Sequence, residues 1–408
     1  MRCVVPCAAL VMALVPSPGR AQSLSLSEAD VLARLSVESP RVRAIRAGID
    51  IARAETLAAG RWPNPRFIED RESVAGVTEY LTMVAQPLPI TGRRGLEVQA
   101  ATALVDAASL RSDDALRRAR ADLRVAYAQL VAAQSRERTL AASRDRLKEL
   151  AEILTRREAQ GDAAGFDRLR AEREVADLEA DLGVAATERA RAQAAVVGFF
   201  GEPADPSRVV ATGASRAAAA TVPGIDALME TALSARGDFR ALQKDADAAA
   251  FAARAADRRR IPEPEVIAGT KSSTFEGGGI GSVFTVTVPL PLFDRGKPER
   301  ALAEARVSQA RAQADLFRLT LRSELEALRA TVIERRQTAG RYQSSAVAGA
   351  DEIERVARVS YDAGERGILE LLDAYRAGST ARVRQAALDL AVRQAEVELE
   401  FVSGWEMP

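Results

Sequence analysis

The sequence predicts a mainly α-helical protein with a small β part, arranged as two tandem repeats of helix, β-hairpin, long helix and helix. Three observations lead to this fold class. Alanine, arginine, glutamate and leucine dominate, and only 4% of residues are aromatic, a composition typical of long helices and coiled coils. Proline and glycine landmarks recur in the same order in the two halves, which indicates an internal duplication. Leucines recur every seven residues in long segments without proline, which is coiled-coil spacing.

The first 21 residues are expected to be a secretory signal peptide. Arg2 precedes an apolar stretch, a turn-forming PSPG segment follows, and cleavage is expected after Ala21. The only cysteines, Cys3 and Cys7, lie in this segment, and the sequence has no histidine. We therefore expect a mature chain with no disulfide, no thiolate or histidine catalysis, no Cys/His metal site and no cofactor. Acidic and basic residues balance at 57 each, so no nucleic-acid partner is indicated.

Three landmarks carry the duplication. The motif WPNP at residues 62–65 is echoed by IPEP 199 residues later. The motif QPLPI at residues 86–90 is echoed by VPLPL 202 residues later. Gly161, which an acidic residue follows, has its counterpart 203 residues later in Gly364. The landmarks keep their order with little drift and predict a signal peptide (1–21), a first repeat (22–200), a linker rich in Pro, Gly, Ser and Ala (201–223), a second repeat (224–404) and a short tail (405–408).

Both repeats are expected to contain the same elements. Prolines end the first helix and the hairpin, and a glycine turn joins the last two helices. The first repeat is predicted to have a helix over 27–61 that begins near Ser25 or Ser27, a hairpin over 66–86 (strands 66–73 and 79–86), a long helix over 94–160, a tip at 161–165 and a helix over 166–200. The second is predicted to have a helix over 225–260, a hairpin over 265–288 (strands 265–270 and 281–288), a long helix over 298–363, a tip at 364–367 and a helix over 368–402.

The long helices carry the heptads. Leucines are seven residues apart in two runs, which are Leu116, Leu123 and Leu130, and then Leu140, Leu147 and Leu154. At 1.5 Å per residue each long helix spans roughly 100 Å. Because this length exceeds the thickness of one membrane, we expect a rod that projects from a membrane. No run of about 18 apolar residues follows the signal segment, so no transmembrane helix is expected.

The hairpins suggest a membrane-embedded sheet. Phe284, Val286 and Val288 alternate with Thr285 and Thr287, which suits a strand between lipid and water. Four strands are too few to close a barrel, and open edges are not viable in lipid. Several chains must then share one barrel, and three chains would supply twelve strands. The alternative is that short soluble hairpins cap a coiled coil.

Further motifs point to a known family. Residues 289–296 read PLPLFDRG, residues 238–242 read DFRAL, with Gly237 at a place where proline is common, and residues 40–44 read PRVRA. Together with the two glycine turns, these motifs resemble the TolC-type outer-membrane efflux protein family over essentially the whole mature chain. The segment 86–94 is similar to the branch that works with heavy-metal cation pumps.

The resemblance implies a homotrimer with a 12-stranded barrel in the outer membrane and a coiled-coil tunnel of helices in the periplasm. It implies passive export of small molecules or metal cations, with a periplasmic adaptor (membrane fusion protein) and an inner-membrane pump of the RND type as partners. It implies no enzymatic activity. The alternative function is a periplasmic coiled-coil scaffold or adaptor without a pore, in which the strands would not enter lipid.

Two carboxylates are candidate gate residues. Glu370 and Asp373 follow the second tip with a spacing of three, which places both on one helical face. The resemblance implies that they line the periplasmic mouth of the pore, where threefold symmetry would stack two acidic rings. The alternative is an ordinary solvated face. The counterparts in the first repeat, Asp167 and Arg170, do not repeat the acidic pair.

The two glycine tips are candidate docking points for the adaptor. Glycine suits them because left-handed backbone conformations and close approach are easy there, although every helix reversal has the same requirement. The candidate residues are Gly161, Asp162, Gly165, Gly364, Glu365 and Gly367. Arg93 and Arg94, like Arg295 and Lys297, follow the hairpins and are expected either to anchor at lipid headgroups or only to solvate helix ends.

Overall fold

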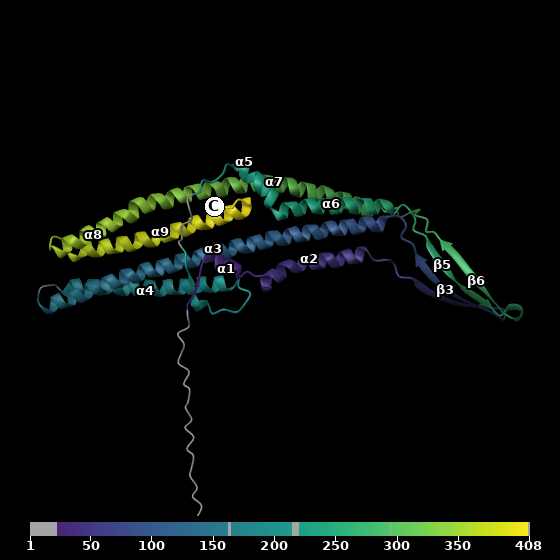
Figure 1. The fold of residues 1–408 in the computed structure, drawn as a ribbon, viewed down its shortest axis with the longest axis horizontal. Helices are drawn as coiled ribbons and strands as arrows, with labels where there is room; N and C mark the ends of the chain where they lie inside the picture. The colour runs from purple at the N-terminus through teal and green to yellow at the C-terminus, as the bar shows by residue number, and fades with distance from the viewer. Residues whose placement is uncertain (1–22, 162–164, 214–219, 294, 407–408) are drawn as a thin grey trace, which may run out of the picture.

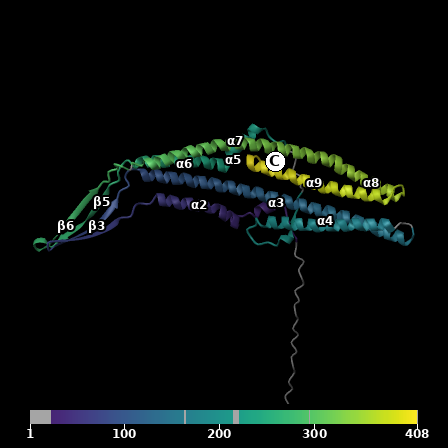
Figure 2. The same cartoon turned by 180° about the vertical axis from the view of Figure 1, so that it is seen from behind.

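A computed structural model describes residues 23–161, 165–213, 220–293 and 295–406. The expected signal peptide and Asp162 lie outside these residues. The molecule is a long, gently curved rod of helices with a small sheet at one end (Figure 1). Two helical hairpins lie side by side and reach the opposite end together, as the view from behind also shows (Figure 2).

The first half begins with two short helices rather than one. Its elements are β1 (Leu24–Leu26), α1 (Glu28–Ala33), α2 (Pro40–Ala59), β2 (Arg66–Val74), β3 (Val77–Pro87), α3 (Arg93–Ala159) and α4 (Gly165–Val197). The single helix expected over 27–61 is wrong, because a new helix begins at Pro40. The Ser39 hydroxyl accepts a hydrogen bond from the Val42 amide at 3.2 Å, and Pro40 has no amide hydrogen to leave unpaired.

The helices of the second half are interrupted twice, once at a place similar to the break in the first half and once within the long helix. Its elements, with those of the linker, are η1 (Pro206–Arg208), β4 (Val209–Ala211), α5 (Ile225–Ala235), α6 (Gly237–Arg258), β5 (Glu265–Ser273), η2 (Phe275–Gly277), β6 (Gly279–Thr287), α7 (Lys297–Tyr342), the π-helical turn η3 (Gln343–Val347), α8 (Ala348–Asp362) and α9 (Ile368–Ser403). The helices expected over 225–260 and 298–363 are therefore broken at Arg236 and at η3. Ser345 donates to the Arg341 carbonyl at 2.7 Å, a side-chain bond of the kind that distorts helices.

Matching glycines frame the long helices of the two halves. Gly92 and Gly296 precede α3 and α7 with φ of 75° and 72°. Gly161 and Gly364 follow the hairpin helices α3 and α8 with φ of 80° and 76°. These left-handed conformations are strained for residues with a Cβ atom, so the glycines account for where the long helices start and stop.

Helix α3 is the spine of the rod. It packs against α2 and α4 of its own half and against α6 and α9 of the other. Leu123 and Leu130 have no exposed surface, and Leu140, Leu147 and Leu154 are also buried. Burial of each such side chain stabilises the fold by about 1.5–3 kcal/mol. Among the described residues, no helix combines the length and apolar character needed to cross a bilayer.

A small second sheet fixes the N-terminal segment to the middle of the rod. β1 pairs in parallel with β4, a strand inside the linker where none was expected. The Tyr127 hydroxyl of α3 donates to the Leu26 carbonyl at 3.0 Å. The linker is thus partly structured, and it holds the start of the chain against α3.

Candidate functional site

The two β-hairpins join into one four-stranded antiparallel sheet. Its order is β2-β3-β5-β6, and β3 and β5 connect the halves through pairs such as Val84 with Ala268. The strands β2 and β6 form the two outer edges (Figure 1). Within the described residues neither edge strand has a partner on its outer side, so both present free backbone donors and acceptors.

One face of this sheet carries a group of large, exposed apolar side chains. Phe67, Val84, Ala268 and Phe284 stand in one row across the four strands, and paired residues of an antiparallel sheet share a face. Phe284 is 72% exposed. The large apolar side chains of this face, hereafter the apolar face, are all exposed: Phe67, Tyr80, Val84, Ile280, Phe284 and Val286. A patch of this kind on a soluble monomer is unusual and marks a contact surface.

The opposite face carries ion pairs between strands, next to the half-buried apolar side chains of Leu81, Met83 and Ile267. Arg66 bonds Glu265 at 2.6 Å across the intervening Ala85, and Lys271 bonds Glu79 at 2.6 Å. Thr285 shares a row with Arg66, as the alternation in the sequence predicts. The sheet is therefore amphipathic in its exposed surface: the apolar face also carries Glu69 and Arg71, but only that face has the large exposed apolar side chains, whereas the ion pairs between strands lie on the other.

The tips of the two helical hairpins are bound together by an apolar cluster. Leu147 and Leu154 of α3 pack with Leu371, Leu372 and Tyr375 of α9. Around this cluster other large apolar side chains remain exposed, namely Phe166, Leu169, Val359 and Leu369. The tips thus combine a fixed core with an uncovered apolar rim.

The candidate tip residues lie where the helices reverse. Gly161 and Gly364 have positive φ, Gly165 begins α4 beside the Glu158 side chain, and Gly367 is the N-cap of α9. The Glu365 amide donates to the Ser360 carbonyl at 2.9 Å, which closes the end of α8. Asp162 lies outside the described residues.

Glu370 and Asp373 stand together in the first turns of α9, and both are exposed. Their neighbours Leu371 and Leu372 are buried against α3, so the carboxylates point away from the tip core. Among the described residues neither carboxylate has a hydrogen-bond or ion-pair partner. In the first half Arg170 stacks on the Phe166 ring at 4.4 Å instead. An unpaired acidic pair therefore occurs at one tip and not at the other.

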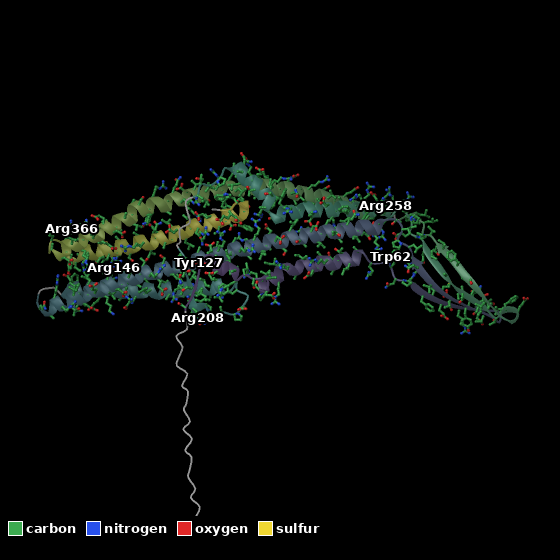
Figure 3. The ribbon with its side chains drawn as sticks, in the orientation of Figure 1. Trp62, Tyr127, Arg146, Arg208, Arg258 and Arg366 are labelled. Carbon is green, nitrogen blue, oxygen red and sulfur yellow. The ribbon has the colours of Figure 1, made fainter. Side chains whose placement is uncertain are left out.

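Sequence reasoning missed an ion-pair cluster that links the two hairpins behind the tips. Glu354 of α8 is bonded by Arg146 of α3 at 3.0 Å and by Arg382 of α9 at 2.8 Å. The position of Arg146 is marked in Figure 3. Glu354 is buried between Ala350 and Ala357 on the inner side of α8. A carboxylate at an apolar seam position was the sequence signal for this cluster.

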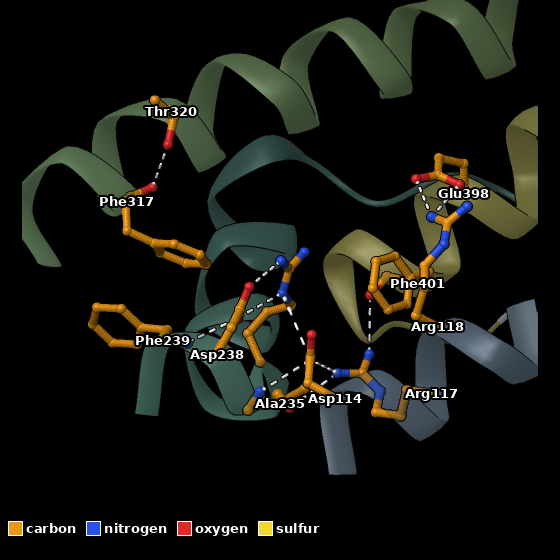
Figure 4. A network of polar contacts seen from close by, with 12 residues as sticks. Asp114, Arg117, Arg118, Ala235, Asp238, Phe239, Phe317, Thr320, Glu398 and Phe401 are labelled. Carbon is orange, nitrogen blue, oxygen red and sulfur yellow. Dashed lines mark hydrogen bonds and ion pairs between the residues drawn. The ribbon is translucent and has the colours of Figure 1, made fainter. Parts of the chain in front are cut away.

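A second cluster that the sequence did not reveal joins five helices at the α5–α6 break (Figure 4). The Arg236 guanidinium lies over the rings of Phe317 and Phe401, at 5.5 Å and 5.2 Å from their centroids. Its Nε donates to Asp238 at 3.0 Å. Arg117 of α3 donates to the carbonyls of Ala235 and Phe401, at 3.0 Å each. Arginines here brace α3 against α5, α6, α7 and α9.

Asp114 is the acidic centre of this second cluster. It accepts a hydrogen bond from the Gly237 amide at 3.2 Å and one from Arg117 at 3.4 Å. Burial and then the nearby charge of Asp238 raise the pKa of Asp114, against the opposing charges of Arg236 and Arg117. The cluster is structural in character, because it sits within the helix packing and away from both ends of the rod.

No group of three or more Asp, Glu, His or Cys side chains able to hold a metal ion occurs among the residues that the structure describes. The chemistry offered by these regions is thus a set of surfaces: an amphipathic sheet with two open edges, an apolar rim at the tips and an unpaired acidic pair.

Two comparisons of the sequence with known proteins gave matches. Residues 228–404 match the family model of outer membrane efflux proteins. The chain is 25% identical to the cobalt-zinc-cadmium resistance protein CzcC of Cupriavidus metallidurans over 351 residues, which cover 84% of this chain and 81% of that protein.

Several solved structures share the fold. A membrane protein from Pseudomonas aeruginosa superposes with a TM-score of 0.77 at 20% identity and covers 92% of this chain and 93% of its own. CusC, described for transmembrane channel formation, has a TM-score of 0.75 at 15% identity and covers 96% and 95%. The CmeC outer membrane channel of Campylobacter jejuni has a TM-score of 0.74 at 14% identity and covers 100% and 95%. The predicted resemblance is confirmed: residues 228–404 match the model of the outer membrane efflux protein family, and over almost its whole length the chain has the fold of the TolC-type channels.

Proposed function

We propose that the chain is the outer-membrane channel subunit of a tripartite efflux system and acts as a passive duct. The amphipathic sheet carries this proposal. Its apolar face is exposed, its other face holds ion pairs, and both edges are open. A lipid-embedded sheet must close its edges. The same four strands repeated three times would give a twelve-stranded barrel with lipid outside and water inside.

The helices support self-association. In the first half, α3 has neighbours from both halves of the chain, whereas α7 packs mainly on α5, α6 and α9 of its own half. The outer side of α7 and α8 leaves Leu316, Leu319 and Ile353 exposed. The α2 and α4 helices of a second copy would cover that side in the way that α6 and α9 cover α3. Such a head-to-tail contact closes into a ring, and we infer a homotrimer.

A cross-linking experiment tests the shared barrel. The cysteines of the sequence lie at positions 3 and 7, so introduced cysteines report cleanly after signal cleavage. Glu69→Cys in β2 combined with Ser282→Cys in β6 is expected to give dimers and trimers with a short bismaleimide in outer membranes. Each single variant is a control for the trimer ladder, and Thr82→Cys with Thr270→Cys, on the paired strands β3 and β5, should give only an internal link. Monomers in a soluble periplasmic extract would favour a scaffold without a pore.

We propose that Glu370 and Asp373 form the acidic gate at the periplasmic mouth. Their exposure, their shared helical face and their lack of basic partners in the described chain support this role. Glu370→Ala with Asp373→Ala should lower cation selectivity or change single-channel conductance in a planar bilayer. Glu352→Ala, which removes another exposed carboxylate on the second hairpin, is the control. Identical recordings for wild type and the double variant would refute the gate.

We further propose that the tips receive a periplasmic adaptor that connects the duct to an inner-membrane pump of the RND type. The apolar rim of Phe166, Leu169 and Leu369 and the glycine turns support this role. Gly364→Trp should weaken capture of the channel by the cognate adaptor. Gly349→Trp on α8, where a Cβ meets open space, is the control. Full capture of Gly364→Trp would exclude this tip.

For cargo we propose metal cations first and small organic molecules second. The order rests on the similarity to a protein named for cobalt, zinc and cadmium resistance. Deletion of the gene should lower the tolerated concentration of these three metals, and plasmid-borne wild type should restore it. Unchanged metal tolerance with lowered tolerance to dyes or solvents would reverse the order.

A further inference from the structure

We propose that the junction between the sheet and the helices is a docking surface for anionic phospholipid headgroups. This inference rests on the proposed function, because only an embedded sheet brings lipid to this level. The surface consists of an apolar band next to the sheet and a group of arginine and lysine side chains just beyond it. We name it the junction belt and define it by Trp62, Leu290 and Leu292 in the apolar band and by Arg61, Arg258 and Lys297 in the basic group.

The apolar band continues the apolar face beyond the end of the sheet. Every second residue from Phe284 to Leu292 is a large apolar side chain, and all of them are exposed: Phe284, Val286, Val288, Leu290 and Leu292. Phe293 is 100% exposed. A side chain of this size left wholly in water at the base of the proposed barrel is best explained by contact with acyl chains.

The basic group lies at the same level of the rod. Figure 3 marks Trp62 and Arg258 at the ends of α2 and α6, next to the base of the sheet. Arg61, Arg258 and Lys297 are exposed. Within the described ranges no acidic side chain pairs with any of the three. Their charges are therefore not neutralised by the rest of the described chain.

Two neighbouring arginines are bonded to other residues of the chain, and for this reason they are not part of the belt. Arg93 bonds Glu97 at 3.0 Å and Glu263 at 3.2 Å. Arg94 donates to the Gly60 carbonyl at 2.7 Å and lies over the Trp62 ring at 5.3 Å from its centroid. These two side chains brace the junction. Of the four residues for which the sequence suggested an anchoring role, Arg93, Arg94, Arg295 and Lys297, the belt keeps Lys297 and adds Arg61 and Arg258.

A groove at the junction has the shape for such a ligand. It has a volume of about 580 Å³ and lies between the 259–263 and 289–293 segments. Leu290, Leu292 and Phe293 form its apolar side, and Arg93 and Arg259 stand at its polar side. Both arginines are ion-paired within the chain, Arg93 with Glu263 and Arg259 with Glu299. A phospholipid would therefore lay the first carbons of its acyl chains on the apolar side and place its phosphate toward the unpaired cations of the belt.

The charge of the belt predicts which headgroup is preferred. Each Lys or Arg near an anionic surface strengthens association by about fivefold, and the effect falls within a Debye length of about 8–10 Å. Zwitterionic headgroups have no net charge and gain much less. The belt should therefore select phosphatidylglycerol or cardiolipin over phosphatidylcholine, and salt should weaken the selection.

Lipid selectivity at the protein surface tests the inference. The full-length trimer is reconstituted, and spin-labelled phosphatidylglycerol and phosphatidylcholine are compared for their motionally restricted fractions. Wild type should prefer phosphatidylglycerol several-fold at low salt. The triple variant Arg61→Gln, Arg258→Gln and Lys297→Gln should lose at least fivefold of that preference, and 0.5 M NaCl should have a similar effect on wild type. The charge-matched control, Arg138→Gln, Arg358→Gln and Arg366→Gln, removes exposed arginines far from the junction and should keep it.

The possible outcomes are distinct. A variant that keeps heat-modifiable trimers and loses the preference supports the belt, and Arg258→Lys should retain it. Equal association of both lipids with wild type, or an undiminished preference in the triple variant, overturns the inference while the duct stands. Weakened trimers with an unchanged preference would show that the basic group faces another copy of the chain, which also overturns it. Absence of the chain from the outer membrane would refute the proposed function itself.

Discussion

The two halves of the chain follow one plan and use it differently. The first half contributes an unbroken helix, α3, whose surface is covered on several sides by helices of both halves. The second contributes α7 and α8, which the π-helical turn separates and whose outer side keeps apolar residues exposed. The acidic pair occurs only in the second half. The first half thus supplies the central packing helix, whereas the exposed side of α7 and α8 and the acidic pair belong to the second half.

The largest expected effect is the difference in stability between a variant at a buried leucine and a variant at an exposed leucine. Leu123 in α3 has no exposed area, and Leu319 in α7 is exposed. Leu123→Ala should destabilise the folded chain by about 2–5 kcal/mol through the cavity that it leaves. Leu319→Ala should leave the fold intact and weaken only the trimer. Thermal unfolding and seminative gels measure the two effects, and equal losses in both variants would contradict the proposed asymmetry.

The next effect concerns the link between the hairpins. Glu354→Ala removes the acceptor that Arg146 and Arg382 share, and we expect a loss of about 1–3 kcal/mol, since these arginines are partly exposed and solvent compensates in part. The distribution of distances between spin labels on the two tips should also become broader. Glu352→Ala, which removes an exposed carboxylate on the same helix, is the matched control. An unchanged distance distribution would show that the leucine cluster alone holds the tips.

A smaller effect compares the helix breaks of the two halves. In the first half Ser39 caps its own helix, whereas in the second half the Gly237 amide bonds Asp114 of α3. A Cβ at Gly237 would collide with the Leu110 carbonyl of α3. Gly237→Ala should therefore cost about 1–3 kcal/mol, measured by thermal unfolding. Gly224→Ala, where a Cβ meets open space, should be nearly neutral, and equal melting of the two variants would count against close packing at the break.

The smallest effect is the pH dependence of Asp114. Because burial raises its pKa in the folded chain, the folded state keeps the proton to higher pH than the unfolded state does. Its contribution to stability therefore falls as pH rises from the ordinary value of 3.8 through the raised pKa. Asp114→Asn has no group that titrates here, so its stability does not decrease over this pH range. The melting temperature of the variant relative to wild type should therefore rise by about 1–3 °C from pH 4 to neutral pH. Asp50→Asn, an exposed change on α2, should run parallel to wild type.

The sequence predicted what local chemistry determines. The glycine turns at 161 and 364 and the prolines around the hairpins predicted element ends, and alternation predicted the faces of β6. Gly92 and Gly296, which precede α3 and α7, were not recognised as helix starts. The sequence did not predict contacts that depend on how helices pack. The pairing of β1 with β4 arises from neighbours distant in the chain. Likewise, Asp114 resembles any other carboxylate of a highly charged helix until α3 lies beside α6, and the position of Glu354 on the apolar side of α8 does not reveal its arginine partners. The helix break at residues 34–39, by contrast, had a local signal that the prediction overlooked, Ser39 directly before Pro40.

The two open edge strands have a genetic consequence. In the proposed trimer each copy must pair its β2 with the β6 of a neighbour, so one faulty edge leaves a gap in the whole wall. A cell that makes equal amounts of sound and edge-damaged chains would form only about one ring in eight from sound chains alone, if assembly is random. A damaged allele should therefore be dominant over the intact one, whereas a simple deletion should be recessive.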